Sequence, residues 1–495
     1  MTAEIRPRRA GVPAKSRLPR VGPTTTQLTV ALTSLLSLLF CATSWAAQAP
    51  ALPDTIDRFI GAELARQRIP GMSIAILRGD SVLLVRGYGS ANVERRITAT
   101  DSTLYSVGSL TKPFTAAAIV LLSQQGKLKL DDPIAKYLPE GAKVWSGVTI
   151  RHLLTHTAGV PQDTTLDYTR NYTEAQLVRS AAQPLQFTPG AMESYSSTGY
   201  ALLGVIIHRV TGVFWGDFVR EQIFEPLGMR TARVNSNADS VPNRAIGYYL
   251  VGDTLQAADR FSPSINSMAD CCLSFTVHDL ARFAIGLNHA KPLGREGQEL
   301  SWTPVRLNNG GTYPYGLGWN IVEQRGYRRI GHSGSWSGFH ASFQRYPDFD
   351  LTVIVLLNLG QANSEGIATV LAGLVDPRLT QPHLLSTPAG PNPATPINRL
   401  LRAIADNNES ALVTPELRAT FPADRRQIVA SFLQAIQTWT PLGCDAVTGR
   451  GIIRLRSGIA HICYAKGTGK PGSLLFTVLY DKGWRAAGLD NVFGI

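Results

Sequence analysis

The spacing of apolar residues along the chain predicts where its first helix and strands lie. Between residues 55 and 68, apolar side chains recur at the three- and four-residue spacing of an amphipathic helix, and a Pro-Gly pair ends the pattern. The segments MSIAIL at 72–77 and SVLLVRGYG at 81–89 are typical of two strands, with a tight turn at the Gly-Asp pair between them. The first part of the fold is therefore predicted to be a helix followed by a β-hairpin.

A second group of strand patterns lies much later in the chain. The segments YRRIGH, FHASFQRYP and LTVIVLLN, all within 327–358, predict antiparallel strands, and 363–375 has the pattern of a helix that closes the unit. Helical patterns and loops rich in glycine and proline fill the space between the two groups. A sheet assembled from both groups, with a helical insertion, is an α+β architecture.

The stretch QPHLLSTPAGPNPATP at 381–396 contains five prolines and no apolar periodicity, which is typical of a linker. Beyond it, helical patterns at about 397–407 and 422–438 precede strand-like runs. We therefore predict a first domain at 52–376, a Pro-rich linker at 377–396 and a small α+β domain of unknown function at 397–495.

The N-terminal segment has the composition of a secretory signal. Its first 20 residues carry six basic residues against one acid, a mostly apolar stretch follows at 28–42, and small residues end it near Ala46. The apolar stretch is shorter than the roughly 20 residues that a membrane span needs. We expect residues 1–46 to be a signal peptide cleaved after Ala46, with no stable membrane span afterwards, and a periplasmic or secreted protein; an uncleaved anchor is the alternative.

Charge and cysteine content narrow the possible functions. The formal net charge is +12, but beyond the N-terminal segment the basic residues are spread out, which does not favour a nucleic-acid partner. Cys444 and Cys463 lie close enough in the chain to pair in an oxidising compartment, whereas a bridge between the adjacent Cys271 and Cys272 would be strained, so we leave these two unpaired. No cysteine or histidine spacing indicates a metal site, and no cofactor is expected.

Ser109 and Lys112 are the first candidates for chemistry. They lie three positions apart at the start of an apolar helical pattern, so their side chains share one helix face and can touch. Pro113 fits only the first turn of a helix, where free N–H groups favour negative charge. A lysine whose pKa is lowered by desolvation can take the serine's proton, so the pair predicts an activated nucleophile and its base.

Two later segments supply further candidates. In TPGAMESYSSTGYALLG at 188–204, Tyr195 can relay a proton and Ser197 can hold a lysine or a substrate oxygen. In RRIGHSGSWSGF at 328–339, Gly334 would let a substrate backbone approach, His332 and Ser333 can bind a carboxylate or carbonyl, and the N–H groups of Ser335 and Ser109 can form an oxyanion hole.

These three motifs, in this order, resemble the pattern of the penicillin-recognising serine hydrolases. The chain resembles the branch that contains class C β-lactamases, D-alanyl carboxypeptidases, family VIII esterases and D-aminopeptidases. The supporting segments are TIRHLLTHTAGVP at 149–161, EPLGM at 225–229, TVHDLARF at 276–283 and YGLGW at 315–319. The resemblance covers about 52–376 and implies a β-lactamase/transpeptidase-like fold, an antiparallel sheet with flanking helices and a helical subdomain.

The chain departs from that pattern at two positions. Where class C β-lactamases carry Tyr-x-Asn, this chain has Ser197, which lacks the two amide donors. Where they carry Lys-Thr-Gly it has His332, a residue that is partly charged at neutral pH when its pKa is near the ordinary value of about 6.5. The sequence thus predicts that the site binds a substrate carboxylate more weakly and in a pH-dependent way. This favours a peptidase or esterase over an efficient β-lactamase.

We therefore predict a secreted serine hydrolase that forms an acyl-enzyme on an amide or ester carbonyl of a small-molecule or peptide substrate. Ser109, Lys112 and Tyr195 would be catalytic, and Ser197, His332, Ser333, Gly334 and Ser335 would bind substrate or the oxyanion. The alternative is a catalytically weak or silent protein of the same fold that binds peptidoglycan or a partner.

Overall fold

The structure is a computed structural model of the chain. It describes residues 51–162, 172–235, 241–258, 268–324, 327–380, 394–406, 408, 412–418, 436–446, 459–469 and 472–492. The predicted signal peptide at 1–46 and most of the predicted linker lie outside the described residues.

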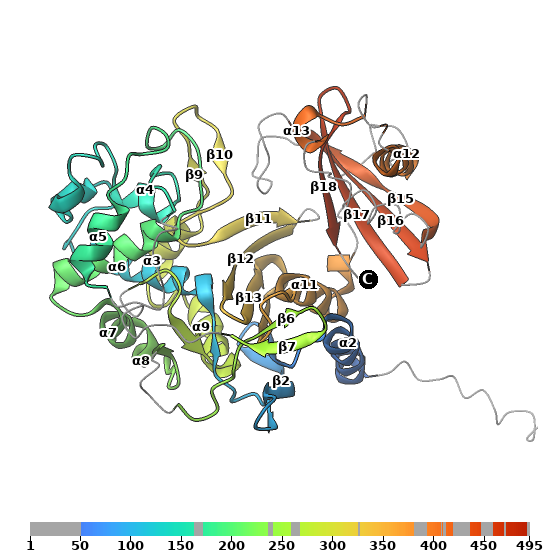
Figure 1. The fold of residues 1–495 in the computed structure, drawn as a ribbon, viewed down its shortest axis with the longest axis horizontal. Coiled ribbons are helices and arrows are strands. Elements are labelled where there is room, and N and C mark those ends of the chain that lie inside the picture. The colour runs from blue at the N-terminus through green and yellow to red at the C-terminus, as the bar shows by residue number, and fades with distance from the viewer. Residues whose placement is uncertain are drawn as a thin grey trace, which may run out of the picture. The chain divides into compact units, whose positions relative to one another are not determined.

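A seven-stranded antiparallel sheet is the main sheet of the part of the chain between Leu52 and Val375 (Figure 1). Its strand order is β11-β12-β13-β14-β1-β2-β3. The bounds are Gly71–Arg78 for β1, Ser81–Asn92 for β2, Ile97–Thr98 for β3, Asn320–Gln324 for β11, Tyr327–Trp336 for β12, Phe339–Tyr346 for β13 and Leu351–Leu357 for β14. Because β1 pairs with β14, the two ends of the domain meet at the middle of the sheet.

Both faces of this sheet are covered, which is why its central strands are almost wholly apolar. Ile74 and Ile76 of β1 face the helices α2 (Leu52–Gln67) and α11 (Ser364–Val375). Ala75 and Leu77 point into the larger core on the other side. A strand buried on both faces carries a continuous apolar run instead of an alternating pattern.

The larger core is formed mainly by helices. The most buried of them are α3 (Lys112–Gln124), α6 (Ser197–Thr211) and α9 (Val277–Asn288). The shorter helices are α4 (Ile150–Leu154), α5 (Glu174–Ala181), α7 (Trp215–Val219), α8 (Glu225–Leu227) and α10 (Gly294–Ser301). The short strands are β4 (Tyr105–Ser106), β5 (Arg233–Val234), β6 (Tyr248–Val251), β7 (Thr254–Ala257), β8 (Leu273–Phe275), β9 (Val305–Arg306) and β10 (Thr312–Tyr313).

Within the described residues, no single helix has both the length and the apolarity of a membrane span. One bent pair, Ser197–Thr211 with Trp215–Leu227, meets those criteria only when its two parts are taken together.

The predicted α+β fold is confirmed, including the sheet assembled from both ends of the domain. The hairpin turns at Gly79, whose φ of 56° lies in the left-handed region that glycine adopts without strain. The late strands and the closing helix lie where the apolar pattern places them.

The C-terminal part has a four-stranded antiparallel sheet of its own, in the order β15-β16-β17-β18 (Figure 1). The bounds are Ile436–Ala446, Ile459–Gly469, Gly472–Asp481 and Ala486–Val492 for the strands, Ala394–Ala405 for α12 and Pro415–Arg418 for α13. Apolar residues of α12, among them Leu400 and Ile404, pack with Val478 of β17 in a separate cluster.

Details at the domain boundaries differ from the sequence pattern. Leu379 packs in the core beside α11 and α2, and α12 begins at Ala394, so both ends of the predicted linker are structured. The predicted second helix, 422–438, lies outside the described residues except for 436–438, where β15 begins instead.

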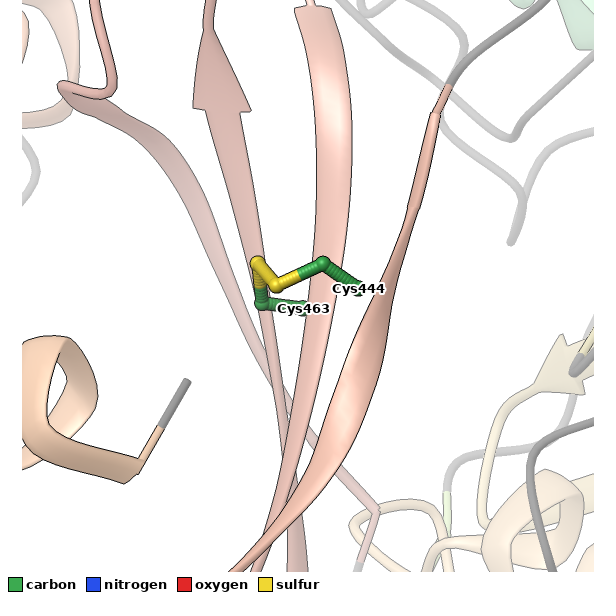
Figure 2. Close-up of a disulfide and its surroundings, with 2 residues drawn as sticks. All are labelled: Cys444 and Cys463. Atoms are coloured by element: carbon green, nitrogen blue, oxygen red, sulfur yellow. A yellow bond between two sulfur atoms is a disulfide. The ribbon is translucent and has the colours of Figure 1, made fainter. Parts of the chain in front are cut away.

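Cys444 and Cys463 form a disulfide between neighbouring strands (Figure 2). The two residues are direct partners in the register of β15 and β16. Cys271 and Cys272 are free and buried. The bridge closes a loop with a sequence separation of 19 residues.

Replacing Cys444 and Cys463 together by serine should lower the free energy of unfolding of the C-terminal part by about 3 kcal/mol, because a loop of this length loses much of its unfolded-state entropy when it is crosslinked. Urea unfolding of the purified chain measures this loss. Reductant should reproduce the loss in the unaltered protein and have no further effect on the double variant. A variant as stable as the unaltered protein would contradict a structural role for the bridge.

Candidate active site

The site starts at the junction between a tight turn and α3. Ser109 lies in the 3-10 turn η1 (Gly108–Thr111), α3 begins at Lys112, and Pro113 occupies its first turn. Ser109 therefore lies in a short 3-10 turn just before the α-helix. The sequence pattern had placed it in the first turn of the α-helix itself. The shared face is as predicted, since Lys112 Nζ donates a hydrogen bond to Ser109 Oγ at 3.0 Å.

Lys112 is completely buried, and its ammonium has an oxygen acceptor for each of its three protons. Besides Ser109 Oγ, Nζ donates to Ser197 Oγ at 3.2 Å and to the backbone carbonyl of Asp270 at 3.0 Å. A carboxylate oxygen of Asp270 lies 3.9 Å from the same nitrogen. A buried ammonium is tolerated only when it is satisfied in this way.

The charge state of Lys112 differs from the sequence expectation. Burial by itself lowers the pKa of Lys112, but the electrostatic influence of Tyr195 and Asp270 outweighs it, so the pKa lies above the ordinary value. The expectation that desolvation turns this lysine into a neutral base is therefore wrong for the resting site. Lys112 is an ammonium at neutral pH.

Tyr195 reaches the same lysine from the loop before α6. Lys112 Nζ lies 4.9 Å from the centre of the Tyr195 ring, and the tyrosine is 37% exposed, so one side of the ring faces solvent. The ring packs on His156, with 4.2 Å between ring centres. His156 Nδ1 also accepts a hydrogen bond from the N–H of Ser196, the residue that caps α6. His156 thereby fixes the loop that carries Tyr195.

Ser197 is the first residue of α6, and two contacts fix it. Its hydroxyl accepts from Lys112, and its N–H donates to Gln162 Oε1 at 2.7 Å. Ser197 thus contacts the lysine, as the sequence suggested for this hydroxyl.

His332 lies on β12 with both ring nitrogens engaged. Nδ1 donates to the carbonyl of Ser333 at 2.6 Å, and Nε2 accepts from the hydroxyl of Tyr315 at 3.0 Å. Burial and the charge of Lys112 lower the pKa of His332 to about 3. The prediction that His332 is partly charged at neutral pH and binds a carboxylate in a pH-dependent way is therefore wrong. The ring of His332 is neutral, and both of its nitrogens already have hydrogen-bond partners.

The backbone of β12 packs directly against the turn that carries Ser109. A Cβ atom on Gly334 would lie 1.8 Å from the carbonyl oxygen of Val107 and 2.9 Å from the nitrogen of Ser109. A Cβ on Gly108 would lie 3.0 Å from the nitrogen of Ser335. Gly334 is thus required by the approach of the protein's own turn, and this approach brings the amides of Ser109 and Ser335 close together.

One edge of β12 is available beside these amides. Strand β11 pairs with β12 only up to Gly331, whereas β13 continues to Trp336. Among the described strands, residues 332–336 therefore have a neighbour on one side only. An extended substrate can add to such an edge through main-chain hydrogen bonds.

The structure thus brings together segments that are far apart in the sequence. Lys112 contacts Ser109, Ser197 and the Tyr195 ring, and the ring centres of Tyr195 and His332 are 6.4 Å apart. The sequence interpretation missed His156, Tyr315 and Asp270. The first two lie inside segments that carried the family resemblance, whereas Asp270 gave no signal except its place beside the cysteine pair.

The two adjacent cysteines, Cys271 and Cys272, pack in an apolar cluster next to the site. Burial raises the pKa of both thiols, so they remain protonated. Among the described residues, no group of three or more His, Cys, Asp or Glu side chains is arranged to hold a metal ion. His152 has a structural contact: it belongs to the capping box of α4, where its Nδ1 accepts a hydrogen bond from the N–H of Thr149.

Comparisons with known proteins identify the family of this site. The family model described as Beta-lactamase matches residues 56–374. Penicillin-binding protein 4* of Bacillus subtilis is 31% identical over 307 residues, which cover 58% of this chain and 67% of that protein. Protein flp of Staphylococcus aureus is 29% identical over 334 residues, which cover 64% of this chain and 65% of that protein. The chain thus spans about two thirds of the length of these relatives.

Two solved structures have a similar fold. The octameric penicillin-binding protein homologue from Pyrococcus abyssi has a TM-score of 0.59 and 23% identity, and the match covers 89% of this chain and 98% of that one. This likeness concerns the fold alone. A D-stereospecific amidohydrolase from Streptomyces sp. has a TM-score of 0.55 and 26% identity, and the match covers 64% of this chain and 97% of that one.

Replacing Gly334 by alanine should lower the free energy of unfolding by about 1–3 kcal/mol, because the added methyl group forces β12 away from the turn that carries Ser109. Urea unfolding measures the loss. Gly61→Ala is the matched control, since a Cβ at Gly61 in α2 meets nothing within 4 Å. Equal stability of the two variants would show that β12 does not pack against the turn as described.

The protonation of His332 should destabilise the protein in acid. Its folded-state pKa of about 3 lies below the ordinary 6.5, so between these values the unfolded chain binds the proton and the folded chain does not. Stability contributed by the neutral ring is complete above 6.5 and falls as the pH is lowered toward 3. In His332→Asn this contribution is absent, and urea unfolding across the range should show a shallower pH dependence.

The control for this measurement is His289→Asn, which replaces an exposed histidine at the surface. A slope in His332→Asn as steep as that of the control would overturn the assignment of a buried neutral ring.

Proposed function

The chain belongs to the beta-lactamase family, and we propose that it is a secreted serine hydrolase that forms an acyl-enzyme through Ser109 on an amide or ester carbonyl. The family supports serine hydrolase chemistry in general. The observation that carries the assignment to Ser109 is the hydrogen bond of 3.0 Å from the buried Lys112 Nζ to Ser109 Oγ. A silent binding protein would have no need to keep a buried lysine against a serine hydroxyl, at the cost of desolvating its charge.

Ser109 becomes a nucleophile when its proton passes to Lys112 and Tyr195. Lys112 is an ammonium at rest, so Lys112 and Tyr195 together must lose one proton before they can act as a base. In that form they accept the proton of Ser109 as its Oγ bonds to the substrate carbonyl carbon. The same proton returns to the departing amine or alcohol when the bond to the leaving group breaks. Water then attacks the carbonyl carbon of the ester formed on Ser109. Lys112 and Tyr195 accept a proton from this water and return it to Ser109 Oγ as the acyl group leaves.

The amides of Ser109 and Ser335 hold the oxyanion that develops on the carbonyl oxygen. Support comes from the packing of Gly334 against the Ser109 turn, which keeps the two amides together. Preorganised donors of this kind contribute about 3 kcal/mol each to the stability of the transition state. Ser197 and Ser333 lie beside the path of the substrate and orient it along the open edge of β12.

The substrate class we propose is a D-amino-acid peptide or amide, or a simple ester, in preference to a β-lactam. A neutral His332 stands where class C β-lactamases have a lysine, so the cation that would hold a β-lactam carboxylate is missing at that position. The similarity to a D-stereospecific amidohydrolase supports the amide side of this choice. Peptidoglycan peptides are natural candidates within this class.

A periplasmic or secreted location is part of the same proposal. The signal-like composition of residues 1–46 supports it. The disulfide between Cys444 and Cys463 supports it independently, because such bridges persist in oxidising compartments.

Replacing Ser109 by alanine should lower the rate of hydrolysis of a p-nitrophenyl ester and of a D-alanine amide by about a thousandfold or more, since the nucleophile is lost. A fluorophosphonate should label one residue of the unaltered protein, which peptide mass spectrometry should identify as Ser109. The control is Ser123→Ala, a change to a serine near the far end of α3, which should leave both rates unchanged. Labelling at any other serine would end the assignment.

A further inference from the structure

Asp270 places a buried negative charge at the catalytic lysine. The residue is only 4% exposed, and it lies in the segment just before β8. One of its carboxylate oxygens lies 3.9 Å from Lys112 Nζ, and the other, Oδ1, is buried with no hydrogen-bond partner. A carboxylate in this position costs desolvation energy, which the charge of Lys112 and the hydrogen bonds from Cys271 and Ser197 offset.

The segment that carries Asp270 is fastened to the same helix as Lys112. Thr115 donates a hydrogen bond to the carbonyl of Ala269 at 2.6 Å, and Thr111 accepts one from the N–H of Leu273 at 3.2 Å. These contacts lie on either side of Asp270. The backbone on both sides of Asp270 is therefore fixed relative to the start of α3, which carries Lys112.

Among the residues that the structure describes, the titratable groups that face Lys112 leave the site without a net positive charge. The lysine supplies one positive charge, and Asp270, 3.9 Å away, supplies one negative charge. Burial raises the pKa of Asp270, and the charge of Lys112 acts against that rise and favours the carboxylate. His156, from the turn after α4, and His332, from β12, both have pKa values lowered by burial and are neutral. The remaining facing groups are Tyr195 and Tyr200 and the protonated thiols of Cys271 and Cys272.

Exchange of a proton within the lysine and aspartate pair does not alter this balance. If Lys112 passes a proton to Asp270, both groups become neutral, and the sum is again zero. Glu193, which lies close enough to raise the pKa of the Tyr315 hydroxyl, adds negative charge on the side of His332.

We propose that Asp270 is a specificity-determining residue whose buried carboxylate cancels the charge of Lys112, so that the site selects acyl donors without a carboxylate next to the scissile bond. This inference rests on the proposed function. It assigns the substrate class as neutral esters, amides and C-terminally blocked D-amino-acid peptides.

The experiment compares two substrates that differ only in one charge. N-acetyl-D-alanyl-D-alanine and its C-terminal amide have the same scissile bond, and kcat/KM is measured for both on one preparation, so the fraction of active protein cancels in their ratio. The unaltered protein should prefer the amide by about tenfold or more, because a carboxylate entering a site with no net positive charge is not compensated. In Asp270→Asn this preference should fall by about tenfold, mainly through faster turnover of the free acid.

Asp279→Asn is the matched control, since Asp279 is also a buried carboxylate but caps α9 and contacts Thr231 and Thr276. Its substrate ratio should equal that of the unaltered protein. An unaltered protein that hydrolyses the acid and the amide equally well, or an Asp270→Asn ratio equal to the control, would overturn the proposal.

A second measurement does not depend on turnover of these peptides or on the folding of a variant. A neutral alkyl fluorophosphonate and an analogue that carries a carboxylate should label Ser109 of the unaltered protein at rates that differ in the same direction, by about tenfold. Equal labelling rates would refute the charge argument while leaving the serine nucleophile intact. Absence of labelling at Ser109 would refute the proposed function itself.

Discussion

The buried ammonium of Lys112 is the interaction on which the rest of the site depends. It can lie in the core only because three oxygen acceptors, from Ser109, Ser197 and the carbonyl of Asp270, surround it. These acceptors come from a tight turn, from the start of α6 and from the segment before β8. The lysine therefore joins three parts of the chain, and loss of one part leaves one of its buried N–H groups without an acceptor.

The sheet supplies a fourth element of the site, the strand β12. Strands β1 and β14 pair at its centre, and β12, which is separated from β1 by β13 and β14, lies against the turn that carries Ser109. Glycines on both sides of this contact, Gly108 and Gly334, allow the two backbones to approach. The proposed oxyanion donors are consequently backbone groups of two packed elements, and they would require no side-chain rearrangement to act.

The sequence was most informative where a local pattern is tied to one geometry. The three-residue spacing of Ser109 and Lys112 implied the contact that the structure has, and apolar runs implied a sheet built from both ends of the domain. Protonation states could not be predicted in this way, because they depend on burial and on neighbours from distant segments. His332 and Lys112 were both misjudged for this reason, in opposite directions.

These two misjudged residues determine the electrostatics of the site together with Asp270. Tyr195 and the carboxylate of Asp270 raise the pKa of Lys112 against the effect of burial, so the lysine keeps its charge. The histidine is neutral because it is buried near the lysine. A cation that is cancelled by an internal carboxylate still polarises the Ser109 hydroxyl, since that interaction acts over 3.0 Å. It offers little to an anion that approaches from solvent, because at longer range the lysine and the aspartate act as one neutral pair. In the mechanism that we propose, the same arrangement activates the nucleophile and gives no help in recruiting an anionic substrate, so one buried pair of charges determines both the chemistry and the choice of substrate.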